Sequence, residues 1–205
     1  MMLYVSHREP TTKVLGPGRR YALWLQGCEK RCPNCIFPAG RPRDRGGQWL
    51  SVEKIWAEIK SVPNLTGITL SGGEPFLQAE ALARLIKFLR DESELDVMIF
   101  TGFTLLELQN RPDSATAFLL ANTDILVDGE YREELNTDSM YRGSDNQVVH
   151  FLSPKYLPYK ALIARTKNRS VEFVYRKGAD FFMVGIPPKD FEKKFLSKLL
   201  KEVET

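Results

Sequence analysis

Residues 20–35 read RYALWLQGCEKRCPNC, in which an apolar, strand-like run over residues 20–26 ends directly at a loop rich in cysteine. The chain has three cysteines, Cys28, Cys32 and Cys35, and all of them lie in this loop. In a reducing compartment, cysteines clustered in this way usually bind a metal or carry out redox chemistry rather than form disulfides. The stretch therefore predicts a metal or redox site at the end of a strand.

The spacing C-x-x-x-C-x-x-C favours an iron–sulfur cluster. A structural zinc site normally closes with four ligands, whereas the chain adds only His7 and His150, neither at the spacing of a zinc motif. Three thiolates on a 4Fe-4S cluster leave one iron without a protein ligand, and that iron is free to bind an exogenous chelating molecule. Zinc and inert, reduced cysteines remain the alternatives.

Outside this loop, β-rich apolar runs alternate with helical patterns, which is typical of an α/β fold with a parallel sheet. Ser51 is expected to cap the first helix, and Leu82, Leu85, Ile86 and Leu89 form the apolar stripe of the second. The expected strands are 20–26, 67–70, 96–100, 124–127 and 147–152, and the expected helices are 51–62, 78–90, 104–109 and 114–120.

Polar or glycine-rich stretches follow four of these strands directly. They are GCEKRCPNC (27–35), SGGEP (71–75), TGF (101–103) and DGEY (128–131). Because chemistry gathers at the carboxyl ends of the strands in parallel α/β folds and barrels, we expect these four loops to share one face of the molecule.

The last fifty residues have a different character. Residues 171–175 and 181–184 flank a turn signal at 177–180 and predict a β-hairpin. Pro187 and Pro188 precede a final helix that we expect to reach about residue 203, with the apolar stripe Phe191, Phe195, Leu199 and Leu200. We therefore divide the chain into a domain over 1–152 and a hairpin–helix extension over 153–205, which forms a separate lobe or packs on the sheet edge.

The composition is that of an ordinary soluble globular protein, with 43% hydrophobic and 27% charged residues. A net charge of +3 is too small to argue for nucleic acid as a partner. No apolar run approaches the roughly 20 residues of a membrane span, and the N-terminus has no secretory pattern. We therefore expect a cytoplasmic protein that acts without nucleic acid or membrane.

The cysteine motif after a first strand, followed by GGEP after a second, resembles the radical S-adenosylmethionine (SAM) superfamily. The resemblance implies an incomplete TIM-like β/α barrel with parallel strands. It implies that the open iron binds the amino and carboxylate groups of SAM, and that Gly72, Gly73, Glu74 and Pro75 contact the amino group. The superfamily often has an aromatic residue before the third cysteine. Here that residue is Asn34 and the nearest aromatic is Phe37, and we assign both to the SAM site.

Three further stretches, TGF, ILVDGEY (125–131) and YRGSDNQ (141–147), resemble the family of anaerobic ribonucleoside-triphosphate reductase activating proteins over residues 12–152. The resemblance implies that Arg142 binds the SAM carboxylate and that Asp128 accepts a hydrogen bond from a ribose hydroxyl. A structural salt bridge for Arg142 and a turn role for Asp128 are the alternatives. The SAM-site residues implied here are Thr101, Gly102, Asp128, Arg142, Ser144 and Asn146.

The function implied by the resemblance is activation of a glycyl radical enzyme. Flavodoxin or ferredoxin reduces the cluster, SAM is cleaved to methionine and a 5′-deoxyadenosyl radical, and the radical abstracts hydrogen from a glycine of a partner enzyme. The alternatives are a small-molecule radical SAM enzyme such as 7-carboxy-7-deazaguanine synthase, and a non-catalytic metal-binding module.

Overall fold

The computed structural model describes residues 1–175, 181–191, 193–195 and 197. Its main element is a seven-stranded sheet with the strand order β3-β1-β2-β4-β5-β6-β7. The four central strands pair in parallel, and they are the first four that the sequence predicts. They are β2 (Arg20–Leu25), β4 (Gly67–Gly72), β5 (Asp96–Phe100) and β6 (Ile125–Asp128). The TIM-like barrel stays a prediction.

Three antiparallel strands flank the parallel ones. The strand β7 (Val148–Phe151) was expected, whereas β1 (Met2–Thr12) and β3 (Gln48–Ser51) were not. β1 pairs with both β2 and β3, and its pairing with β2 is interrupted by register shifts. The second half of β1 is rich in polar residues, so it lacks the apolar pattern of a strand. β3 is short and directly follows a Pro- and Gly-rich loop, so it also lacks a clear strand pattern. Their pairing partners, distant in sequence, stabilise them.

The helices begin where the sequence offers caps. Ser51 accepts from the Lys54 amide at the start of α1 (Val52–Ser61), and Thr104 forms a capping box with Glu107 at the start of α3 (Leu105–Gln109). The other helices are α2 (Ala79–Glu92), α4 (Ser114–Ala121) and the unpredicted α5 (Lys160–Arg165). Short 3₁₀ segments are η1 (Pro38–Gly40), η2 (Pro75–Gln78), η3 (Glu133–Leu135) and η4 (Pro154–Tyr159). No helix in the described ranges has the length and apolar character needed to cross a membrane.

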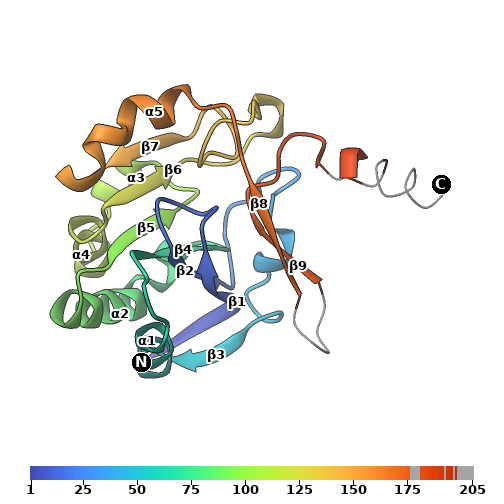
Figure 1. Cartoon of the computed structure of the whole chain (residues 1–205). Coiled ribbons are helices and arrows are strands. Elements are labelled where there is room, and N and C mark those ends of the chain that lie inside the picture. The colour runs from blue at the N-terminus through green and yellow to red at the C-terminus, as the bar shows by residue number, and fades with distance from the viewer. Residues whose placement is uncertain (176–180, 192, 196, 198–205) are drawn as a thin grey trace.

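The two faces of the sheet have different partners. Figure 1 shows α1, α2 and α4 along one face, where side chains of β2 such as Tyr21 and Leu23 join the main core. The alternate residues of β2, Ala22 and Trp24, pack on the opposite face against Leu15 and Val184. Because successive side chains of a strand point to opposite faces, one short strand connects the helical core with the second face.

The C-terminal extension packs on this second face. Its hairpin consists of β8 (Val171–Tyr175) and β9 (Phe181–Gly185), as the sequence predicts. The turn predicted at 177–180 lies outside the described residues. Residues 191, 193–195 and 197 are helical, and the remainder of the predicted final helix, with Leu199 and Leu200, also lies outside them.

The extension also contacts a buried ion pair between Arg20 of β2 and Asp96 of β5. The guanidinium of Arg20, fully buried, lies 2.6 Å from Oδ1 of Asp96. The Tyr156 hydroxyl donates to Oδ2 of the same carboxylate at 2.6 Å, and Lys155 lies 3.0 Å from it. Burial and the Asp96 charge raise the pKa of Tyr156, so its hydroxyl remains a donor. Asp96 is thereby shared between the domain core and the extension.

Replacing Tyr156 with phenylalanine should lower the free energy of unfolding by about 2 kcal/mol, because a hydrogen bond to a buried charged group is lost. Chemical denaturation measures this difference. Tyr159→Phe is the matched control, since Tyr159 is 50% exposed and should change stability little. Equal effects of the two substitutions would show that the Tyr156–Asp96 bond does not stabilise the fold.

Candidate functional site

The cysteine loop follows β2 and is held by backbone hydrogen bonds to two other segments. The amide of Gly27 donates to the Gly40 carbonyl at 2.8 Å, and that of Cys28 donates to Arg41 at 3.0 Å. On the other side, the amide of Glu74 donates to the Gly27 carbonyl at 2.9 Å. The loop is therefore fixed between the end of β4 and the chain that leads to β3.

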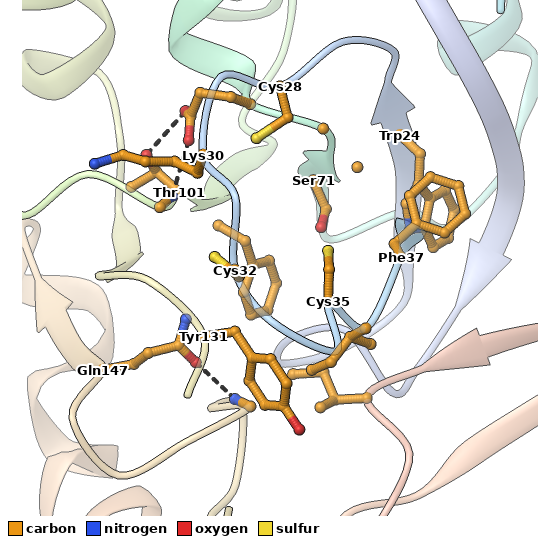
Figure 2. Close-up of a pocket in the computed structure, with 18 of the residues that line it drawn as sticks. Trp24, Cys28, Lys30, Cys32, Cys35, Phe37, Ser71, Thr101, Tyr131 and Gln147 are labelled. Carbon is orange, nitrogen blue, oxygen red and sulfur yellow. Dashed lines mark hydrogen bonds between the residues drawn. The ribbon is translucent and has the colours of Figure 1, made fainter. Parts of the chain in front are cut away.

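All three cysteines line one cavity of about 290 Å³. Figure 2 shows their sulfur atoms around a common space, with Ser71 beside them. The predicted loops after β2, β4, β5 and β6 all contribute to this cavity, which confirms that they share one face. Its lining includes Cys28, Cys32, Cys35, Phe37, Gly72, Gly73, Glu74, Thr101, Gly102, Gly129 and Tyr131.

Two glycines of the GGEP stretch allow the cysteine loop to approach β4. Gly72 has a φ of 104°, and a Cβ on it would lie 2.4 Å from the Leu25 carbonyl oxygen. A Cβ on Gly73 would lie 2.2 Å from the Gly27 carbonyl oxygen. Because both obstacles are backbone atoms, side chains at these positions would displace the strand or the loop.

Glu74 is fully buried and holds the next loop in place. Its carboxylate accepts hydrogen bonds from the Phe76 amide (3.0 Å), the Thr101 hydroxyl (2.9 Å) and the Gly102 amide (2.8 Å). Burial raises the pKa of this carboxyl to about 7, and the three hydrogen bonds only partly offset that effect. Glu74 therefore joins the ends of β4 and β5 and takes up a proton near neutral pH.

This raised pKa predicts a pH dependence of stability for the protein without cofactors. The ordinary pKa of a glutamate side chain is 4.5, and in the folded protein the pKa of Glu74 is about 7. Between pH 4.5 and 7 the folded state therefore keeps a proton on Glu74 that the unfolded state has lost. Stability should therefore fall as pH rises from 5 to 7, by about 2 kcal/mol. Thermal unfolding of wild type and Glu74→Gln at both pH values isolates the contribution of Glu74 to this pH dependence, because glutamine does not titrate. An identical pH slope in the two proteins would contradict the assignment.

The donor set fits a cofactor that is bound through thiolates. Burial raises the pKa of Cys28 to about 11, with further increases from Glu74 and the other two thiols, and burial also raises the pKa of Cys32. Loading must therefore release protons and is favoured at higher pH. Within the described part of the chain, no three His, Cys, Asp or Glu side chains form a set that could hold a single metal ion. Three thiols on separate irons of one cluster suit the cavity, and Ser71, Gly73 and Glu74 line it beside them.

Six of the residues assigned from the sequence do not line this cavity. Asn34 donates its side-chain amide to Glu133 at 2.5 Å on the surface, and Pro75 is the buried first residue of η2. The Asp128 carboxylate accepts from the Leu105 amide at 2.6 Å and lies 2.9 Å from the His150 ring. The six residues outside the cavity lining are Asn34, Pro75, Asp128, Arg142, Ser144 and Asn146. The roles of these residues toward SAM stay predictions.

The YRGSDNQ stretch contributes other residues than those assigned. Arg142 donates to the Gln147 carbonyl at 3.2 Å, and Ser144 accepts from the Arg132 amide at 3.0 Å. Asn146 donates to the Glu130 carbonyl at 2.8 Å. Gly143 and Gln147 line the cavity instead. The stretch reaches the cavity through Gly143 and Gln147, because the loop conformation decides which of its residues face the cavity.

Other lining residues were not assigned to the site from the sequence. Lys30 is 16% exposed, lies 3.1 Å from Glu130 and stacks over the Phe103 ring at 4.4 Å. Lys30, Ser71 and Tyr131 lie in the polar loops that follow the strands, and the positions of these loops are the signal that indicates them. The remaining lining residues are Leu15, Trp24, Ile36, Phe100 and, from the extension, Phe182, Met183, Gly185, Ile186 and Pro187.

Residues 14–150, which include every loop described above, match the 4Fe-4S single cluster domain family. The chain belongs to this family. The 4Fe-4S single cluster domain of this chain is 33% identical over 148 residues to an anaerobic ribonucleoside-triphosphate reductase-activating protein of Vibrio cholerae, covering 69% of the chain and 93% of the relative. An Escherichia coli protein of the same name is 33% identical over 152 residues, covering 70% of the chain and 95% of that protein.

A shorter similarity reaches a second type of activating enzyme. Over 82 residues the 4Fe-4S domain is 37% identical to a pyruvate formate-lyase-activating enzyme of Staphylococcus epidermidis, covering 38% of the chain and 33% of the relative. These relatives confirm the resemblance predicted from the motifs, and they are activating enzymes.

Proposed function

We propose that this chain is a radical SAM enzyme that activates a glycyl radical enzyme of the anaerobic ribonucleotide reductase type. The observation that carries the proposal is that the three cysteines, Ser71 and the GGEP glycines line one cavity. The names of the relatives that the chain covers almost completely support the choice of partner.

When bound, the cofactors supply a one-electron reduction that cleaves SAM and yields a 5′-deoxyadenosyl radical able to take hydrogen from a glycine. The chain's own residues position them. Cys28, Cys32 and Cys35 hold the cluster. The backbone at residues 71–73 lines the cavity beside the thiols and would hold the amino group of SAM, while Glu74 keeps the Thr101–Gly102 loop against the cavity. Apolar side chains such as Trp24, Phe37 and Phe100 exclude water around the reacting groups.

We further propose that the open, seven-stranded sheet is part of an incomplete TIM-like barrel and that the protein works in the cytoplasm. The parallel core of four strands with helices on one face supports the first point. Reducing conditions, which keep the three thiols available, suit the second.

Anaerobic reconstitution with iron and sulfide tests the function. The expected results are a 4Fe-4S spectrum that changes when SAM is added, release of 5′-deoxyadenosine after reduction, and a glycyl radical doublet on mixing with an anaerobic ribonucleotide reductase. Stoichiometric zinc without iron after anaerobic purification would refute the cluster assignment. Cleavage of SAM with radical transfer to a small molecule but to no protein would favour the small-molecule alternative.

The electron donor that we propose is a small acidic carrier such as flavodoxin or ferredoxin. A groove next to the cavity shares Cys28 with it and is lined by Arg31, Arg41, Arg43 and Arg45. Two of these arginines face acidic neighbours, Arg43 at 3.3 Å from Glu29 and Arg45 at 3.5 Å from Asp44, so the groove keeps a positive excess.

Charge reversal in this groove should slow reduction by the carrier selectively. We expect Arg43→Glu together with Arg45→Glu to lower the rate of cluster reduction by photoreduced flavodoxin about tenfold at low salt, with a smaller effect at high salt. Arg84→Glu on α2 is the matched control. Reduction by dithionite should be the same in all variants. A carrier rate that does not depend on salt or on Arg43 and Arg45 would rule out this docking surface.

A further inference from the structure

The β8–β9 hairpin and the residues directly after it form one side of the cysteine cavity. Phe182, Met183, Gly185, Ile186 and Pro187 all line the cavity that holds the three thiols. The family match ends at residue 150, so none of these residues belongs to the matched domain. The site of this chain thus includes a segment that the family match does not describe.

The hairpin is anchored to the sheet through its aromatic and apolar side chains. The Phe182 ring stacks on His7 with centroids 3.6 Å apart and meets Trp24 edge-on at 5.8 Å. Val184 is fully buried against Leu15 and Trp24. Because Trp24 and Phe182 themselves line the cavity, this packing fixes the hairpin at the site rather than at a distant edge.

Polar contacts hold the hairpin at the start of β8. Glu172 of β8 accepts from the Thr12 hydroxyl at 2.6 Å and from the Lys13 amide at 3.0 Å. Arg169, just before β8, is 8% exposed, donates to the Arg142 carbonyl at 3.0 Å and pairs with Asp138 at 2.7 Å. The YRGSDNQ loop and the hairpin are therefore fixed to each other as well as to β1.

The two sides of the cavity differ in chemistry. The central strands and the loops after them contribute the thiols and the polar Ser71, Glu74 and Thr101 beside the apolar Trp24 and Phe100, whereas the described part of the extension lines the cavity without a polar side chain, through Phe182, Met183, Gly185, Ile186 and Pro187. SAM has a charged amino-acid end and a flat, less polar adenosine. A ligand of this kind is bound best when each end meets the matching side of a pocket.

We infer that the hairpin is a wall of the SAM site, with Met183 and Ile186 as residues that contact the adenosine end of SAM. This inference rests on the proposed function for its ligand, but the wall itself does not. It also supplies the apolar surface that Asn34, in the place of the usual aromatic, does not offer to the cavity.

Thiol accessibility tests the wall in the protein without cofactors. Cys32 and Cys35 line the cavity but not the arginine groove that also reaches Cys28, so the rate at which these two thiols react with dithiodipyridine reports access to this one site. Phe182→Ala removes the aromatic anchor and should raise that rate about tenfold, because local opening becomes easier. Phe181→Ala is the matched control, since Phe181 neighbours Phe182 but is 62% exposed. Equal rates in Phe182→Ala and Phe181→Ala would show that the hairpin does not restrict access to the thiols and is not a wall of the site.

Equilibrium dialysis of SAM with the reconstituted protein tests the contact. Met183 lies outside the apolar cluster that anchors the hairpin, so Met183→Ala should leave the fold intact and raise the Kd for SAM about fivefold. An unchanged Kd in both Met183→Ala and Ile186→Ala would overturn the assignment. If wild type itself fails to bind SAM, the proposed function fails, while the thiol rates still decide whether the hairpin is a wall.

Discussion

Cys32→Ala is expected to abolish SAM cleavage, with 5′-deoxyadenosine formation falling to background after anaerobic reconstitution. Cys32 is the middle cysteine of the motif, is only 9% exposed, and lines the cavity together with Cys28 and Cys35. The chain has no further cysteine to replace it, so a cluster would keep two thiolates. Loss of an outer-shell partner already costs up to about a hundredfold in metal affinity or activity, and loss of a ligand should exceed that. Iron content, the absorbance of the cluster and 5′-deoxyadenosine together measure the effect.

The control for this experiment is Arg31→Ala, which changes the neighbouring, exposed residue of the same loop. With dithionite as reductant it should retain cluster and cleavage, because Arg31 does not line the cavity. Cleavage that persists in Cys32→Ala at the wild-type rate would show that the three cysteines are not the ligand set.

Gly73→Ala should destabilise the protein by about 4 kcal/mol, in the range of exceptional single substitutions. The added Cβ would lie 2.2 Å from the Gly27 carbonyl oxygen and 2.7 Å from that of Gly40, and neither backbone atom can rotate away. The cysteine loop or the end of β4 must therefore shift, so we also expect poor cluster incorporation in the protein that does fold. Chemical denaturation and iron content measure the two effects.

Gly102→Ala is the matched control, because it tests whether any alanine in place of a glycine of this site destabilises the protein. A Cβ on Gly102 would lie 2.9 Å from Cγ of Lys30, a side-chain atom that can move by rotation about the Cα–Cβ bond, whereas the obstacles at Gly73 are backbone atoms. We expect a loss below about 1 kcal/mol for this variant. If Gly73→Ala is as stable as Gly102→Ala and loads iron normally, the close approach of β4 and the cysteine loop does not constrain this site.

The predictable part of the fold is the part with strong local patterns. The four parallel strands and the helices α1 to α4 follow from local patterns in one short window each, such as the Ser51 cap of α1 and the apolar stripe of α2. β1 and β3 escape such a search, because β1 carries Ser6, His7, Arg8 and Glu9 in its middle. Pairing with β2 makes β1 a strand, and no window of the sequence contains both partners.

The sequence by itself determined the chemistry of this protein. The cysteine spacing, the GGEP stretch and the order of the polar loops after the strands are covalent features, and a parallel sheet carries such loops to one edge. Only the tertiary structure decided which side chains face the cavity, because that depends on loop conformation and strand register. It showed that Gly73 is needed for contact with Gly27, that Gln147 rather than Arg142 reaches the cavity, and that Phe182 brings the extension to it.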